Sequence, residues 1–82
     1  MKPYVKLYLK HFDCDINTWI KCEIPDCNSR AVDIHHVEAR GMGGTKAPEN
    51  INNLIALCRS CHIKYGDKKQ YMDMLKEIVA NR

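Results

Sequence analysis

Four cysteines in two close pairs constrain this chain more than any other feature of its sequence. Cys22 and Cys27 have four residues between them, Cys58 and Cys61 have two, and about thirty residues separate the pairs. Each short spacing lets two thiolates converge on one ion while the backbone turns around it. The spacing therefore predicts a tetrahedral zinc site that contributes on the order of 10 kcal/mol or more to folding. Unpaired buried thiols or two disulfides are the alternative, and Cys14 lies outside both pairs.

The length of the chain explains why it needs such a site. A chain of 82 residues has room for one small domain, expected to span 1–82 with its core at 22–66. A domain of this size buries only roughly 60 to 65% of its unfolded surface, so apolar packing alone leaves it marginal. Its odd number of cysteines, five, and the lack of an apolar run of roughly 18 residues predict an intracellular, cytoplasmic protein with no membrane association.

Two segments before the glycine-rich stretch carry apolar residues in recognisable patterns. From Pro3 to Phe12 the pattern fits either a strand or a helix, and the proline near its start favours a helix. Trp19 to Ile24 and Ala31 to Val37 are short runs rich in residues that favour strands. The glycines from Gly41 to Gly44 then predict a turn that can bring backbone close to a ligand.

The second half of the chain predicts a strand followed by two helices. Asn53 to Leu57 is expected to be a returning strand, and Arg59 to Tyr65 a short helix that ends at Gly66. A C-terminal helix is expected at about 67–80, with Asp67 as its cap. Its apolar residues recur at helical spacing, as expected for core packing: Tyr71, Met74, Leu75, Ile78 and Val79.

Histidines gather between and beside the cysteine pairs. His35 and His36 follow Asp33 closely, and His62 comes directly after Cys61. A lone histidine on an apolar strand is usually a packed core residue, but three histidines in one segment bounded by cysteine pairs indicate a functional site. Neighbouring side chains on a strand point to opposite faces, so His35 and His36 can have different roles unless a bulge or the strand end brings them together.

These residues together resemble the HNH endonuclease signature. The resemblance rests on the histidine pair, on the Cys-x4-Cys knuckle and on Asn-Leu-x-x-Leu-Cys-x-x-Cys-His from Asn53 to His62, and it covers about Cys22 to Tyr65. It implies an α+β fold, a small zinc-stapled ββα-metal (HNH, His-Me finger) domain with flanking helices. Chains of this length with a Gly-rich loop are similar to stand-alone HNH proteins of phages and bacteria.

The resemblance also implies a role for each matching residue. His35 and His62 would bind a catalytic divalent metal, His36 would be the general base that activates water, and Asn53 would orient the ring of His36. Neutral imidazole, with an ordinary pKa near 6.5, suits that role. The expected ion is Mg²⁺ or Mn²⁺, with Ni²⁺ or Zn²⁺ as alternatives. The expected products of DNA hydrolysis are a 5′ phosphate and a 3′ hydroxyl.

Three positions leave parts of this assignment open. Some relatives have a third histidine ligand one helical turn after the position of His62, where this chain has Gly66. Asn50 and Asn52 compete with Asn53 for the orienting role, although only Asn53 directly precedes the Leu of the signature. Asp33 is either a hydrogen-bond partner of a histidine or a solvated or capping carboxylate.

Basic residues on both sides of this site predict contacts with DNA. Arg40 and Lys46 flank the glycines, Arg59 and Lys64 lie near His62, and each can equally be a solvated surface charge. The net charge of +3 is mild, so we expect weak nicking or double-strand cleavage, with a protein partner or a homodimer supplying the targeting. The alternative is a non-catalytic zinc module that binds nucleic acid or a protein partner.

Overall fold

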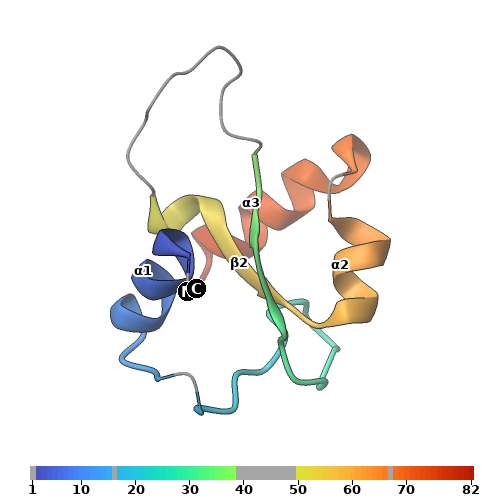
Figure 1. Ribbon diagram of the computed structural model, residues 1–82. Coiled ribbons are helices and arrows are strands. Elements are labelled where there is room, and N and C mark those ends of the chain that lie inside the picture. Colours follow the sequence, from blue (N-terminus) through green and yellow to red (C-terminus); the bar gives the residue numbers. More distant parts are fainter. Residues whose placement is uncertain (1, 16, 39–49, 67) are drawn as a thin grey trace.

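The chain forms a two-stranded sheet with helices on both sides. The computed structural model describes residues 2–15, 17–38, 50–66 and 68–82. In chain order the elements are α1 (Pro3–His11), β1 (Asp33–His36), the 3₁₀ turn η1 (Ile51–Asn53), β2 (Leu54–Leu57), α2 (Arg59–Tyr65), the 3₁₀ turn η2 (Lys69–Tyr71) and α3 (Met72–Ala80) (Figure 1). This is the α+β, ββα arrangement with flanking helices that the sequence predicts.

The two strands pair antiparallel, and their register decides which side chains share a face. His35 lies opposite Ile55, and His36 lies opposite Leu54. Directly opposed residues of an antiparallel pair point to the same side, and successive residues alternate. His35 and His36 therefore point to opposite faces of the sheet, as the strand pattern predicts.

All four residues of β2 are buried, because helices cover both faces of that strand. Leu54 and Ala56 pack against Tyr8 of α1 on one face. On the other face Ile55 and Leu57 belong to a larger cluster that includes Leu75 and Val79 of α3 and two of the cysteines, Cys22 and Cys58. Figure 1 shows α1 on one side of the strand pair and α2 on the other. The sheet thus separates an α1 side from an α2–α3 side.

The helical predictions are confirmed, with small changes at the ends. The N-terminal segment is helical from Pro3 to His11, so the helical phasing is the correct one. The helix Arg59–Tyr65 has the bounds that the sequence predicts. The C-terminal helix has a 3₁₀ first turn, and its buried residues are Leu75 and Val79, both in the expected stripe. Asp67, its expected cap, lies outside the described residues.

The strand predictions are partly wrong. Trp19 to Ile24 is not a strand, and its ladder contact is a single bridge between Lys21 and Arg30. The cysteine knuckle explains this, because the chain reverses within it: Asp26 has a φ of 69°, and Cys22 donates its N–H to the carbonyl of Ser29 at 2.8 Å. The second run forms a strand only from Asp33 to His36, and Asn53 lies in η1 just before β2.

One carboxylate ties together segments that are distant in sequence. An oxygen of Glu23 accepts hydrogen bonds from the Tyr8 hydroxyl at 2.7 Å and from the backbone N–H of Ala56 at 2.6 Å. Arg82 donates to the same carboxylate at 2.8 Å and to the carbonyl of Ile51 at 2.5 Å. Burial and the neighbouring Glu23 raise the pKa of Tyr8 above its ordinary value. These bonds connect α1, the cysteine knuckle, β2 and the end of α3.

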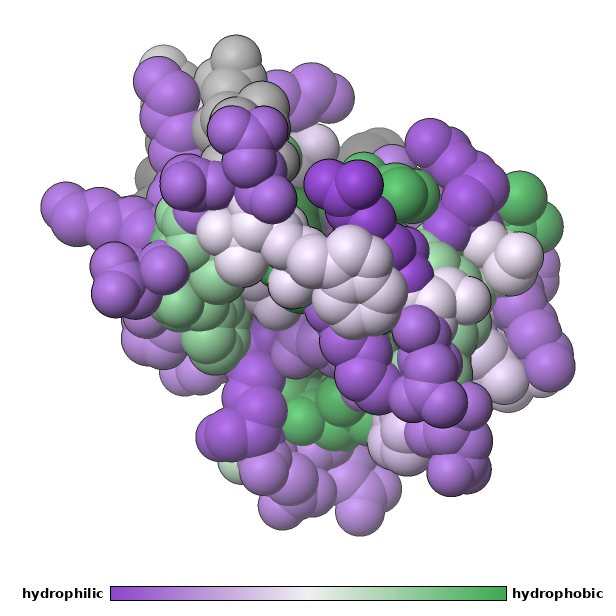
Figure 2. All heavy atoms as spheres, turned by 90° about the horizontal axis from the view of Figure 1, so that it is seen from below, coloured by the Kyte–Doolittle hydropathy of each residue, from purple (hydrophilic) through white to green (hydrophobic). Residues whose placement is uncertain are grey.

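One face of the molecule is mainly polar (Figure 2). On the face that Figure 2 shows, hydrophobic side chains form separate patches between hydrophilic ones. The exposed large hydrophobic residues are Phe12, Trp19, Val32 and Ile63. Among the described residues, every helix is too short to cross a membrane.

Candidate active site and metal centre

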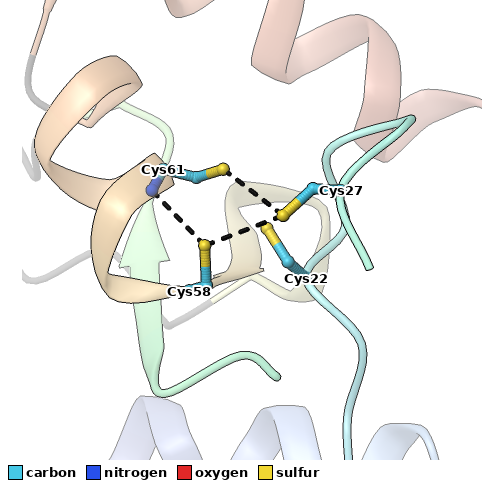
Figure 3. Close-up of side chains that lie close together, drawn as sticks. All are labelled: Cys22, Cys27, Cys58 and Cys61. Atoms are coloured by element: carbon cyan, nitrogen blue, oxygen red, sulfur yellow. Dashed lines mark hydrogen bonds between the residues drawn. The ribbon is translucent and has the colours of Figure 1, made fainter. Parts of the chain in front are cut away.

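The four cysteines that the sequence pairs come together at one point. Cys22 and Cys27 approach from the knuckle, Cys58 precedes α2 and Cys61 lies in its first turn, with the sulfur atoms turned toward one another (Figure 3). All four sulfur atoms lie within 4.8 Å of one another, and they are the one such metal-binding group among the described residues. This cluster can hold a metal ion such as zinc.

The sulfur spacing fits tetrahedral coordination. Cys27 Sγ lies 3.8 Å from Cys58 Sγ and 3.7 Å from Cys61 Sγ. Four thiolates about 2.3 Å from a central ion would have sulfur atoms about 3.8 Å apart. The Cys58 side chain also caps α2 by accepting the backbone N–H of Cys61 at 3.4 Å. Helix formation and metal-ligand geometry therefore use the same turn of chain.

The thiols differ in how readily they lose a proton. The backbone N–H of Ser29 lowers the pKa of Cys27 to about 7. Burial raises the pKa of Cys22, and burial together with the other sulfurs raises the pKa of Cys61. Without a cation, several thiolates cannot share this buried space. Binding a divalent ion offsets their repulsion and releases protons, so metal affinity is linked to pH.

Two histidines face each other on the α2–α3 side of the sheet. His35, 7% exposed, extends from β1, and His62 extends from α2; their ring centroids lie 4.9 Å apart with the planes at 56°. Two imidazoles that bind one ion at about 2.0–2.1 Å, roughly 90–110° apart, have centroids roughly 4.5–5.2 Å apart. The residues present therefore fit a shared divalent ion.

A carboxylate fixes the orientation of one of these rings. Asp33 Oδ2 lies 3.0 Å from His62 Nδ1, and its other oxygen lies 3.4 Å from the guanidinium of Arg59. When Nδ1 of a histidine donates to a carboxylate, its Nε2 carries the lone pair that binds metal. Of the two alternatives for Asp33, the structure shows the contact with a histidine.

His36 lies on the opposite side of the sheet, at the end of β1. Its half-buried imidazole packs against Tyr4 of α1, with ring centroids 4.5 Å apart and planes at 60°. The two neighbouring histidines thus meet different surroundings: His35 faces His62, and His36 faces an aromatic ring. Sequence patterns did not indicate Tyr4 as part of the site, although it lies four residues before Tyr8 and so on the same face of α1.

Asn53 acts on the end of β1 through the main chain. Its Oδ1 accepts the N–H of Glu38 at 2.8 Å, and its Nδ2 donates to the carbonyl of Glu38 at 3.0 Å. Its own carbonyl accepts the N–H of Val37 at 2.8 Å. Asn50 instead caps η1 by accepting the N–H of Asn52. Asn50 and Asn53 therefore have different roles, and Asn53 fixes the backbone just after His36.

Gly66 is required by its close approach to His62. A Cβ at position 66 would lie 2.5 Å from both Cδ2 and the carbonyl oxygen of His62. The φ of Gly66 is −70°, so its backbone conformation does not require glycine. With His62 in this position, the site has no space for a third histidine at position 66.

Two of the four basic residues expected at DNA can be placed. Arg59 is exposed and contacts Asp33, and the Lys64 ammonium lies 5.2 Å from the ring centroid of Tyr65. Arg40 and Lys46 lie outside the described residues, as does the glycine stretch between them.

A cavity that the sequence did not indicate lies beside the end of β1. It measures about 270 Å³ and is lined by His36, Val37, Tyr65, Lys68, Lys69, Met72 and Leu75. Its two lysines come from the turn between α2 and α3, where the sequence indicated only solvated charges outside the apolar stripe.

Comparison with known proteins identifies a family. The family model described as HNH endonuclease matches residues 20–68, more than half of the chain. No curated protein and no solved structure gave a match. The matched segment includes the cysteine cluster, both histidines of β1, Asn53 and His62, and it leaves out α1 and α3.

Proposed function

Because the chain belongs to the HNH endonuclease family, we propose that it is a metal-dependent nuclease that hydrolyses phosphodiester bonds of DNA. The observation that best supports this proposal is that the ring centroids of His35 and His62 lie 4.9 Å apart. A third histidine, His36, follows His35 at the end of β1. A purely structural zinc module needs the four cysteines but has no use for this second set of residues.

The two metal sites would have different roles. Zinc at Cys22, Cys27, Cys58 and Cys61 would stabilise the fold, since this closed set of four thiolates offers no position for substrate. A second ion, Mg²⁺ or Mn²⁺ with Ni²⁺ or Zn²⁺ as alternatives, would be held by His35 and His62. When bound, it would neutralise charge on the phosphoryl oxygens and on the leaving 3′ oxygen.

The side chains around the second site prepare it for hydrolysis. Asp33 keeps the proton of His62 on Nδ1, which leaves Nε2 for the ion. His36 accepts the proton of the attacking water as general base. Asn53 fixes the backbone that follows His36 through its bonds to Glu38. The products would carry a 5′ phosphate and a 3′ hydroxyl.

Basic residues would bind the phosphates on either side of the cleaved bond. Arg59 contacts Asp33 beside the histidine site, Lys64 lies two residues after His62 on α2, and Arg40 and Lys46 complete the proposed set. Lys68 and Lys69 add positive charge at the cavity beside His36. Such contacts position DNA without reading its sequence, so a protein partner or a second copy of the chain would supply targeting.

A plasmid nicking assay tests the proposal. We expect the zinc-loaded protein to convert supercoiled DNA to nicked or linear forms with Mg²⁺, Mn²⁺, Ni²⁺ or Zn²⁺, and His36→Ala to lose at least a hundredfold in rate. His11→Ala is the matched control, because His11 is exposed at the end of α1, away from the site. Equal cleavage by wild type and His36→Ala with every metal would reject His36 as the general base. No cleavage by wild type with any metal would reject the nuclease and favour a non-catalytic zinc module.

A further inference from the structure

We propose that Tyr4 is a positioning residue that holds the imidazole of His36 in the orientation needed for proton transfer. This inference rests on the proposed role of His36 as general base. The ring of Tyr4 lies against that of His36, with 4.5 Å between centroids, and the side chain is half-buried. The contact comes from α1, so a helix outside the family-matched segment completes the site.

Tyr4 has a fixed position because α1 is anchored one turn further along. Tyr8 is 3% exposed, packs with Leu54 and Ala56, and donates its hydroxyl to Glu23. Residues four apart lie on the same face of a helix, so anchoring Tyr8 directs Tyr4 toward the same side of the sheet. Leu54, which lies opposite His36 in the register, belongs to the cluster against which Tyr4 packs.

The contact with Tyr4 restrains the imidazole of His36 itself, whereas the main-chain hydrogen bonds restrain only the backbone beside it. The bonds between Asn53 and Glu38 fix the backbone just after His36 and do not act on its imidazole directly. A general base must hold its reacting atom within about 0.5 Å and 10–20° of the productive geometry. An aromatic ring packed against the imidazole restricts its rotation about the side-chain bonds.

The experiment compares Tyr4→Leu with Tyr4→Phe and with a packing control, Leu7→Ala. Leu7 packs against the same cluster as Tyr4 and has no ring to place against His36. We expect Tyr4→Leu to lower kcat about tenfold to a hundredfold with KM within about twofold, because a small misplacement of a reacting group has effects of this size. Tyr4→Phe keeps the ring and is expected to restore kcat, and Leu7→Ala is expected to retain it despite a lower Tm.

A nuclear magnetic resonance measurement tests the contact without relying on DNA cleavage. In the zinc-loaded protein at one fixed pH, loss of the Tyr4 ring current should shift the ring-proton signals of His36 in Tyr4→Leu, while those of His11 stay in place. Unshifted His36 signals, or equal losses of kcat in Tyr4→Leu and Leu7→Ala, would overturn the inference. A wild type inactive with every metal would instead reject the proposed function, and the His36 signals would still decide whether the Tyr4 ring lies against that of His36.

Discussion

Cys61 and His62 are neighbours in α2, yet they belong to sites that are built in different ways. The cysteine site takes its ligands from two short turns, and its four sulfur atoms converge on one point. The histidine site takes single residues from β1 and α2, and a carboxylate orients one of them. A closed set of four ligands suits a structural ion, while a site with few protein ligands leaves room for water and substrate. The comparison teaches that one helix start can contribute to two sites of different construction.

Removing one sulfur should have the largest effect. Cys58→Ser removes one of the four sulfur ligands, so we expect the protein to lose zinc and to unfold. Structural zinc contributes on the order of 10 kcal/mol to the free energy of folding. Cys14→Ser, outside the cluster, should keep both. Metal content and far-ultraviolet circular dichroism measure the two outcomes. A folded, zinc-loaded Cys58→Ser protein would show that the four-cysteine assignment is wrong.

A substitution of Glu23 tests a contact that stabilises the fold away from the metal sites. Glu23→Gln removes the charge that Tyr8, Ala56 and Arg82 share, so we expect a loss of about 3 kcal/mol in the free energy of unfolding. Zinc content should stay at the wild-type value. Urea unfolding measures the change, with the exposed Glu77→Gln as control. Equal stability of the two variants would contradict the importance of this contact.

Changing Asp33 should affect the histidine site alone. Asp33→Asn weakens the hold on His62 Nδ1, so we expect affinity for the catalytic ion to fall about tenfold to a hundredfold. Zinc at the cysteines should remain. Titration of cleavage rate against Mn²⁺ and calorimetry of Mn²⁺ binding measure the effect, with Asp73→Asn on α3 as control. An unchanged Mn²⁺ affinity would remove Asp33 from the metal site.

The smallest expected effect concerns the hydroxyl of Tyr8 and depends on pH. Burial first, and then Glu23, raises the pKa of Tyr8 above its ordinary 10.0, so the folded state favours the neutral phenol. The stabilisation of the folded state by the neutral Tyr8 phenol is therefore fully present below pH 10 and is lost as the pH rises further. Tyr8→Phe should be about 1 kcal/mol less stable than wild type at pH 7 to 9.

That difference should shrink above pH 10, because only wild type has a phenol to ionise at this position. Urea unfolding at several pH values measures it, and Tyr71→Phe, a half-buried tyrosine in η2, is the control. A difference that stays constant up to pH 11 would mean that the hydrogen bond to Glu23 does not favour the neutral phenol.

Sequence patterns predicted the helices, because the ends and the buried faces of a helix depend on residues that are close together in the chain. The bounds of α2 follow from the capping side chain of Cys58 and from Gly66 at the other end, both visible in the sequence. The buried stripe of α3 follows from residue spacing, and the proline at the start of α1 favours a helix where spacing alone also fits a strand. Trp19 to Ile24 was mispredicted as a strand, because the knuckle that follows it competes with strand pairing and local β propensity does not include that competition.

The candidate site could be predicted as a set of residues but not as an arrangement. The sequence indicated the cysteine cluster, the alternation of His35 and His36, and Asp33 as one of two possibilities. It did not indicate that Asn53 bonds to the main chain of Glu38, or that Tyr4 contacts His36 from more than thirty residues away. The bonds of Asn53 depend on how β2 pairs with β1, and the contact of Tyr4 depends on how α1 docks on the sheet. No local pattern contains that information.

The sequence by itself determined the four metal-binding cysteines, the family signature and the strand that gives two neighbouring histidines opposite directions. Spacing determines these features, since two thiolates a few residues apart converge and successive strand residues alternate. Only the tertiary structure decided which group each histidine meets: His62 for His35, Tyr4 for His36 and Asp33 for His62. Those partners come from different elements. Burial of the apolar faces of α1 and β2 brings Tyr4 to His36, and the second cluster, with Ile55, Cys58 and Cys61, brings α2 to the other face of the sheet.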